Sequence, residues 1–389
     1  MQIPEFRQRL RDLGAAPPHQ GRLLRAWLQA QPLESGRKVA ARTFYPAALF
    51  QALPALAEEL GGLARVEAEH PAGDGSSRLL VRLADGQTVE SVLLLRDGLC
   101  VSSQVGCAVG CVFCMTGRSG LLRQLTSGEI VAQVVLARAR RPVKKVVFMG
   151  MGEPSHNLEA VLEAIALLGA EGGIAHKNLV ISSVGDERLF DALDARMAQP
   201  GAVRPALALS LHSSREALRA ELLPRAPRLP VETLVARADA YARASGYPIQ
   251  FQWTLIDGVN DGPEELEGIA RLLAGRHAMM NFIPYNAVDG LPWQRTPWDR
   301  ALALARELNQ RRVLTRLRYS AGQEVDGGCG QLRARHVEAR DADDPAHASE
   351  AEPIAAQRPP SRRPPVRTPE EAQVRVMSLV RQTQQAEQA

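Results

Sequence analysis

Between residues 143 and 320, the chain alternates short apolar runs with amphipathic segments of helical spacing. Most of the apolar runs are hydrophobic on both faces, which is typical of parallel strands buried beneath helices. Six βα units in series with right-handed crossovers predict an α/β fold built on a complete or partial (β/α)6-type barrel. The predicted strands are 143–149, 178–183, 206–212, 248–256, 278–283 and 313–319, and the predicted helices are 158–168, 186–198, 215–223, 231–244, 263–273 and 299–311.

Three patterns precede the barrel. Residues 78–95 hold two β-rich runs around Asp85-Gly86, a strong turn signal that predicts a hairpin. Thr126-Ser-Gly-Glu129 has the pattern of a capping box and predicts a helix over 130–140. Residues 1–66 read as short helices rich in Arg and Lys, and predict a small accessory domain. That domain either contacts RNA, so that deleting it weakens RNA binding, or is an ordinary solvated helical cap.

The composition changes after about residue 337. Residues 338–389 are rich in Pro, Ala and charge and have little to bury, so we expect a disordered Pro/Arg-rich tail. Its RPPSRRPPVR stretch either touches RNA phosphates or keeps the chain soluble. A short helix is expected over 370–381, with no assigned role.

Composition and cysteine usage narrow the class of protein. The chain has 389 residues and a formal net charge of +4, which permits an anionic partner without requiring one. The N-terminus has no apolar signal segment and no apolar run is long enough to span a bilayer, so we expect a cytoplasmic protein without a membrane partner. An odd number of cysteines, five, does not suit a secreted disulfide framework and favours metal or redox chemistry.

Three cysteines form a C-x3-C-x2-C loop: Cys107, Cys111 and Cys114. Three thiolates can hold one corner of an iron–sulfur cubane and leave the fourth iron without a protein ligand, whereas electron-transfer clusters use four. S-adenosylmethionine (SAM) can chelate such an open iron. The alternative is a closed iron–sulfur or zinc site in which Cys100 is the fourth ligand.

Six motifs stand in one order along residues 76–337: CVSSQVGCAVGCVFCMTG (100–117), FMGMGEPSHN (148–157), SLHS (210–213), VNDG (259–262), NFIPYN (281–286) and GCGQL (328–332). In this order they resemble the RlmN/Cfr-type radical SAM RNA (adenine-C) methyltransferase family. The resemblance implies a radical SAM barrel, a 4Fe–4S cluster on the three loop cysteines, SAM as cofactor, and methylation of an adenine ring carbon.

The resemblance also assigns the SAM contacts. It implies that these are Gly152, Glu153, Ser182, Ser210, Leu211, His212 and Asn286. Out of context, the GMGEP segment reads as a Gly-Pro turn and the histidine as a buried core residue. All four groups fall at or just after the predicted ends of strands, where active sites of (β/α) barrels gather.

Three further residues receive catalytic roles from the resemblance. Cys329 is similar to the cysteine that carries a methyl group to the RNA, and Cys100 to the thiol that then releases the product through a transient disulfide. Glu90 is similar to the family's proton acceptor. Taken singly, Cys329 reads as an inert buried thiol and Glu90 as an edge charge that discourages aggregation.

Two departures concern the two branches of the family. Ala321 stands where the RlmN branch usually has Arg, and Met115-Thr-Gly-Arg-Ser-Gly-Leu reads like the Cfr branch. We expect methylation at adenine C2, with C8 as the alternative. The resemblance implies ribosomal RNA, and also transfer RNA, as substrate, a reductant such as a flavodoxin, and a monomer. The rival hypothesis is a non-catalytic iron–sulfur or zinc protein that binds RNA or senses redox state.

Overall fold

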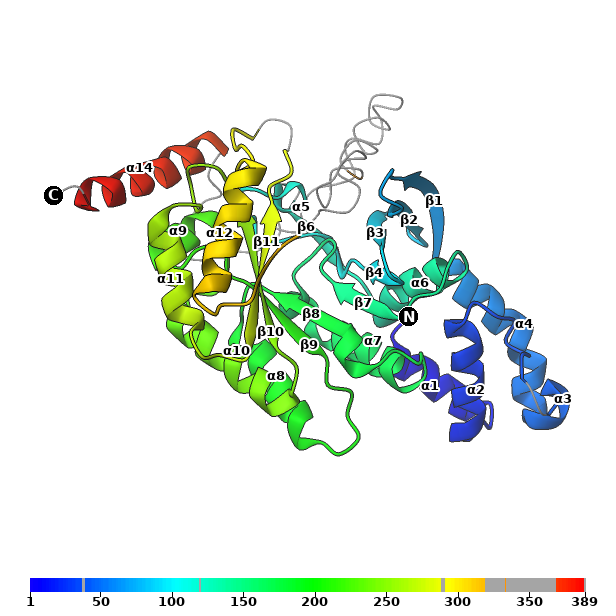
Figure 1. The fold of residues 1–389 in the computed structure, drawn as a ribbon. Coiled ribbons are helices and arrows are strands. Elements are labelled where there is room, and N and C mark those ends of the chain that lie inside the picture. The colour runs from blue at the N-terminus through cyan, green and yellow to red at the C-terminus, as the bar shows by residue number, and fades with distance from the viewer. Residues whose placement is uncertain (37–38, 119, 288–290, 319–332, 334–368, 388–389) are drawn as a thin grey trace, which may run out of the picture.

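The computed structural model describes residues 1–36, 39–118, 120–287, 291–318, 333 and 369–387. Ten strands form one curved sheet in the order β1-β2-β3-β4-β7-β8-β9-β10-β11-β12, and a separate pair, β5 and β6, lies beside it (Figure 1). Helices cover the outer side of the sheet. The α/β fold predicted from the alternating pattern is confirmed.

The barrel consists of six parallel strands. The predicted strands and helices are all present, with boundaries shifted by a few residues. The strands are β7 (Lys145–Phe148), β8 (Leu179–Ser183), β9 (Ala206–Ser210), β10 (Ile249–Leu255), β11 (Ala278–Pro284) and β12 (Thr315–Leu317). The helices are α7 (Leu158–Ala170), α8 (Glu187–Ala198), α9 (Glu216–Leu222), α10 (Val231–Ser245), α11 (Pro263–Leu273) and α12 (Trp298–Gln310), and η1 (Pro154–Asn157) and η2 (His176–Asn178) are short 3-10 turns.

The two faces of the barrel strands have different neighbours. Side chains such as Phe148, Ile181 and Trp253 point outward and join the large core beneath the helices. The inward face carries a separate small apolar cluster that includes Val147, Ala206 and Ala208 and, from outside the barrel, Val92 and Cys100. At these positions the inward face therefore carries smaller apolar side chains than the outward face does.

An antiparallel extension continues the barrel sheet on one side. It comprises β1 (Ala64–Pro71), β2 (Ser77–Leu83), β3 (Thr88–Leu94) and β4 (Gly98–Cys100), and β4 pairs in parallel with β7. The predicted hairpin is β2–β3, and Gly86 in its turn has a φ of 83°, which suits glycine. Strand β1 was not predicted, and it begins within the segment assigned to the N-terminal helices.

The N-terminal helices share the core of the barrel domain. They are α1 (Ile3–Asp12), α2 (Pro17–Leu28), α3 (Ala41–Phe44) and α4 (Ala47–Gly62). Phe6 and Leu24 are fully buried in one cluster with Val131 of helix α6 (Ser127–Arg138). Helix α6 begins at the predicted capping box, in which the Thr126 side chain accepts from the backbone of Glu129. These helices therefore stabilise the barrel, and deleting residues 1–66 would expose its core as well as remove cations.

Helix α14 (Pro369–Glu387) packs on α9, at the far end of the molecule from the N-terminal helices (Figure 1). It contains the short helix expected over 370–381 and extends beyond it, within the tail that was predicted to be disordered. Val376 and Val380 are buried one helical turn apart, which explains why this piece of the tail docks. In the described ranges, no helix combines the length and apolarity needed to cross a membrane.

Ser127 joins the first helix to the barrel domain. Its hydroxyl accepts a hydrogen bond from the Ile3 amide at 2.8 Å and donates one to Glu163 at 2.6 Å. We predict that Ser127→Ala lowers the free energy of unfolding by about 1–3 kcal/mol, because the buried Ile3 amide loses its partner. Denaturant unfolding should show the loss. The matched variant Ser245→Ala, which removes two long 3.3 Å bonds of a half-buried hydroxyl at a helix end, should change stability by less than about 0.5 kcal/mol. Equal losses would contradict this account.

Candidate active site

The cysteine loop lies between β5 (Gln104–Gly106) and β6 (Leu121–Gln124), and ends in the short helix α5 (Met115–Arg118). Its start is fixed by a hydrogen bond from the Cys107 amide to the Gly120 carbonyl at 2.8 Å. Gly106 has a φ of 81°, and a Cβ there would lie 1.9 Å from the same carbonyl. The close approach of the two strands therefore requires glycine at this position.

The three loop thiols lie within electrostatic reach of one another. Burial raises the pKa of Cys107 to about 12 and the pKa of Cys111 well above its usual value, and the charges of the neighbouring cysteines raise both further. Burial also raises the pKa of Cys114. Three thiolates so close together would repel one another, and the positive charge of a bound metal offsets that repulsion and so favours the deprotonated form of the thiols that ligate it. The donor set therefore fits an iron–sulfur cluster.

A single metal ion is a different case. Among the described residues, no three His, Cys, Asp or Glu side chains are gathered as ligands of one ion. Cysteines that bind a cluster ligate separate irons, so they need not converge on one point.

Cys100 lies apart from the loop, at the end of β4. It pairs in register with Val92 and Val147 and belongs to the apolar cluster inside the barrel. The charges that act on its thiol are those of Arg78 and Glu90, and burial raises the pKa of Cys100 to about 12. The charge of Glu90 acts on the thiol of Cys114 as well as on that of Cys100. Among the described cysteines, no two are joined by a disulfide.

The GMGEP segment follows β7 and passes close to the strand that leads into the cysteine loop. Gly152 has a φ of 108°, and a Cβ there would lie 2.7 Å from the Gln104 side chain. The Glu153 carboxylate is buried and accepts hydrogen bonds from the amides of Ser155 and Val184, both at 3.0 Å. Glu153 thus ties the end of β7 to the end of β8 and still has lone pairs for a cofactor amine.

His212 connects the barrel to the cysteine loop. Its ring packs against Phe113, which stands between the second and third loop cysteines, with centroids 4.8 Å apart. Its Nδ1 accepts from the Thr254 amide at 3.0 Å, and Asn260 donates to its carbonyl at 2.7 Å. His212 has a φ of 61°, so Asn260 holds a backbone conformation that is unfavourable for histidine. Sequence reasoning listed the VNDG motif but missed this role of its asparagine.

The remaining predicted SAM contacts lie at the same rim of the barrel. Ser182 and Ser210 are on the inward faces of β8 and β9, in alternation with the inward-facing Val180 and Ala208. The side chain of Leu211 points into the outer core, so any cofactor contact of Leu211 is through its backbone. Asn286 follows β11, and its side-chain oxygen accepts from Arg295 at 3.0 Å.

Arg219, which sequence reasoning missed, is a cation beside the loop. Only 5% of it is exposed, and its guanidinium donates to the carbonyls of Val184 and Ser210. Burial lowers the pKa of Arg219 to about 10, and the charge of Cys111 opposes that shift. A buried positive charge so close to the thiols offsets part of their repulsion. Arg219 could have been identified from the sequence, because it is an arginine on the otherwise apolar face of a short predicted helix.

Glu90 is buried in an internal strand, which contradicts the alternative that it is an edge charge. It is 2% exposed and forms an ion pair of 3.2 Å with Arg78, which is 3% exposed. Its other oxygen accepts from the Arg333 amide at 2.8 Å. Cys329 and Ala321 lie outside the described residues. Arg333 and Arg78 are the partners of Glu90 that motif reasoning missed.

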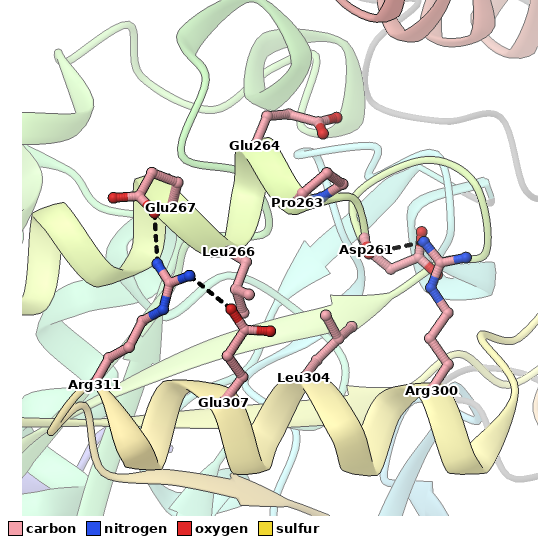
Figure 2. A pocket seen from close by; sticks show the side chains of 9 residues that line it. All are labelled: Asp261, Pro263, Glu264, Leu266, Glu267, Arg300, Leu304, Glu307 and Arg311. Atoms are coloured by element: carbon pink, nitrogen blue, oxygen red, sulfur yellow. Dashed lines mark hydrogen bonds and ion pairs between the residues drawn. The ribbon is translucent and has the colours of Figure 1, made fainter.

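A surface hollow of about 430 Å³ lies between α11 and α12 and is not part of this site. In Figure 2, Arg300 points at Asp261, and Arg311 lies between Glu267 and Glu307. These five charges are thus paired with one another, and Glu264, which also lines the hollow, pairs with Arg215 outside it. Asp261 of the VNDG motif also accepts from Thr296 at 2.9 Å, so it has a structural role.

Comparisons with known proteins agree with the motifs. The sequence profile of the Radical SAM superfamily matches residues 101–273. A probable RNA methyltransferase of Thiobacillus denitrificans is 61% identical over 373 residues, which cover 96% of this chain and 98% of that protein. One from Methylibium petroleiphilum is 67% identical over 335 residues, covering 86% and 93%. The crystal structure of a radical SAM methyltransferase from Sphaerobacter thermophilus matches with a TM-score of 0.71 at 34% identity, covering 85% of this chain and 97% of that chain.

The buried state of His212 predicts a pH dependence of stability. Burial lowers the pKa of His212 to about 3, and the Arg219 charge lowers it further, while the unfolded value is near 6.5. Between these values the unfolded chain binds one more proton, so stability falls as the pH decreases from about 6.5 toward 3, by up to about 1.4 kcal/mol per pH unit from this group.

Denaturant unfolding of the metal-free protein at pH 6.5 and 5.0 measures this dependence. His212→Asn is the control, because Asn tolerates a positive φ and its oxygen can replace Nδ1 as acceptor. The variant should lose that part of the pH slope. A slope equal to that of the wild type would show that His212 is not the group responsible.

Proposed function

This chain belongs to the radical SAM family of RNA methyltransferases, and from that membership we propose that it methylates a ring carbon of an adenine in RNA. Membership of the superfamily implies an iron–sulfur cluster and SAM. The observation that carries the proposal is the placement of the three-cysteine loop against the ends of the barrel strands, through the contact of Phe113 with His212.

We propose that Cys107, Cys111 and Cys114 hold a 4Fe–4S cluster with one open iron. When bound together with SAM, this group supplies a 5′-deoxyadenosyl radical that can abstract hydrogen from an unactivated C–H bond. The chain's own residues position the cofactor: Gly152, Glu153, Ser182, Ser210, the Leu211 backbone, His212 and Asn286 line the rim beside the loop. The neutral His212 ring donates only through Nε2, because Nδ1 already accepts from Thr254.

The target atom explains why two further cysteines are needed. C2 and C8 of adenine are electron-poor and do not attack a SAM methyl group directly. In the proposed reaction Cys329 would take a methyl group from SAM and give up one hydrogen atom of that group to the deoxyadenosyl radical. The remaining S–CH2 carbon would bond to the adenine ring with loss of one electron to a redox partner, and Glu90 would remove the ring proton. The Cys100 thiolate would then attack the Cys329 sulfur, so that an S–S bond forms, the S–CH2 bond breaks and the released carbon takes up a proton to become the methyl group of the RNA.

The connectivity of the chain supports the proposal that Cys329 acts together with Glu90 and Cys100. Arg333 is bonded to Glu90 and lies four residues after Cys329, and four residues span at most roughly 14 Å. The high pKa of Cys100, about 12, means that its thiol must lose a proton before it can attack. Glu90 acts on that thiol electrostatically and is the candidate to take this proton once the ring proton has passed on to solvent.

For the position of methylation we propose C2, with C8 as the alternative. The substrate is ribosomal RNA or transfer RNA, and the electron comes from a reductant such as a flavodoxin. The N-terminal helices are the proposed RNA contact, and Arg42 is an exposed cation there, whereas Arg25 is paired with Glu171. Mass spectrometry of modified adenosines from cells with and without the gene distinguishes the two ring positions.

The first test is cleavage of SAM. Anaerobically reconstituted protein reduced with dithionite should convert SAM to 5′-deoxyadenosine, because an open iron can bind the cofactor. Cys114→Ala should lose both iron and this activity. Wild-type protein that holds a full cluster yet forms no 5′-deoxyadenosine would contradict the proposal and favour a closed, non-catalytic site.

The variant Cys100→Ala shows whether Cys100 is the thiol that releases the product or a fourth ligand of the cluster. We expect the variant to keep its cluster and to accumulate a covalent protein–RNA adduct, because no thiol resolves the link through Cys329. Denaturing gels of the reaction with labelled RNA detect the adduct, and iron content reports the cluster. Loss of iron to the level of Cys114→Ala would identify Cys100 as a fourth ligand.

A further inference from the structure

The six barrel strands contain no Asp or Glu, yet the inward face of the barrel carries three cations. Lys145 opens β7, Arg316 lies in the middle of β12 and Arg318 follows that strand. Strands β7 and β12 are the first and last of the six barrel strands. Positive charge therefore gathers on the two strands that begin and end the barrel.

The register of the strands shows that these cations share the inward face. Val146 and Phe148 point outward into the large core, so Lys145 alternates with them and points inward. Arg316 pairs with Asn281, whose neighbours Met280 and Phe282 also point outward, and Arg316 itself is exposed to solvent at the mouth of that face. Burial lowers the pKa of Lys145, and the charges of Arg318 and Arg316 lower it further. The three cations thus lie close enough to repel one another.

Asn281 presents an unused donor at the same place. It is 0% exposed, and its oxygen accepts from Arg318 Nε at 2.7 Å. Its Nδ2 is buried and has no hydrogen-bond partner. Within the described parts of the chain, none of the three cations forms an ion pair with a carboxylate. A buried amide without an acceptor, beside cations that have no carboxylate partner among the described residues, is an arrangement that suits an anion.

We propose that Lys145, Arg316, Arg318 and Asn281 form a binding site for a backbone phosphate of the RNA substrate. The inference rests on the proposed function and adds a substrate contact to it. Asn281 pairs with Gln252, which pairs with Ser210, so Asn281 lies two strands, about 10 Å, from a proposed SAM contact. Lys145 is the first residue of its strand and lies farther from that rim. Asn281 and Arg318 would therefore hold the phosphate on the side of the cofactor, and Lys145 would contact it from the far side.

Phosphate suits these donors better than the carboxylate of SAM does. Lys145 is the first residue of its strand, whereas the proposed SAM contacts lie at or beyond the opposite ends of their strands. Arginine forks and lysine also match the several oxygens of a phosphate.

The test is the salt dependence of RNA binding by the reconstituted full-length protein under anaerobic conditions. The probes are large-subunit ribosomal RNA and unfractionated transfer RNA. The double variant Lys145→Gln with Arg316→Gln should weaken binding on the order of tenfold and lower the slope of log K against log salt by about 1, because one phosphate contact is lost. The charge-preserving pair Lys145→Arg with Arg316→Lys should keep most of the wild-type slope.

Lys177→Gln with Arg306→Gln is the matched control, since it removes two exposed cations from outside the barrel. It should leave the slope within about 0.3 of wild type. An unchanged slope in the Lys145/Arg316 variant, or an equal drop in the control, would overturn the proposal.

Binding of SAM and binding of inorganic phosphate are measured on the same variants, to show whether the anion at this site belongs to RNA, to SAM or to free phosphate. Loss of SAM affinity, or of inorganic phosphate binding, with an unchanged RNA slope would likewise overturn the proposal. Formation of 5′-deoxyadenosine without RNA is measured on the same samples. Its absence in wild type would refute the proposed function, whereas its presence with an unaltered RNA slope would refute only the phosphate site.

Discussion

Three cysteine side chains share a small space at the ends of the barrel strands, where their thiolate forms would repel one another. The positive charge of Arg219 offsets part of that repulsion, and its guanidinium is held by hydrogen bonds to the carbonyls of Val184 and Ser210. The loop itself is fixed on both sides, by the bond from Cys107 to Gly120 and by the packing of Phe113 on His212. A cluster at this position would therefore bind to a loop whose backbone is held in position by the protein itself.

Around the loop, single polar side chains connect the ends of neighbouring strands. Glu153 joins the end of β7 to β8, and Asn260 holds the unfavourable backbone of His212. These residues belong to motifs that resemble those of a catalytic family, yet the hydrogen bonds that they form in the structure hold the backbone in place. The same side chains that would contact SAM thus also hold the rim in shape, so variants at these positions will combine effects on binding and on stability.

The sequence predicted the parts of the structure that depend on local patterns. Apolar runs identified all six barrel strands, and Asp85-Gly86 and Thr126 identified the hairpin and the capped helix α6. Contacts between distant segments were not predictable in this way, because no local pattern encodes them. One example is the ion pair of Glu90 with Arg78, and another is the hydrogen bond from the Arg333 amide to Glu90. Both depend on how separate segments of the chain pack.

The claim on which the whole account depends is that one iron of the cluster has no protein ligand and binds SAM instead. Electron-nuclear double resonance of the reduced, reconstituted protein with SAM labelled with nitrogen-15 at its amino group tests it directly. The account predicts a hyperfine coupling between that nitrogen and the cluster, in the wild type and in Cys100→Ala alike. A cluster that forms fully but shows no coupling to the labelled nitrogen would contradict it.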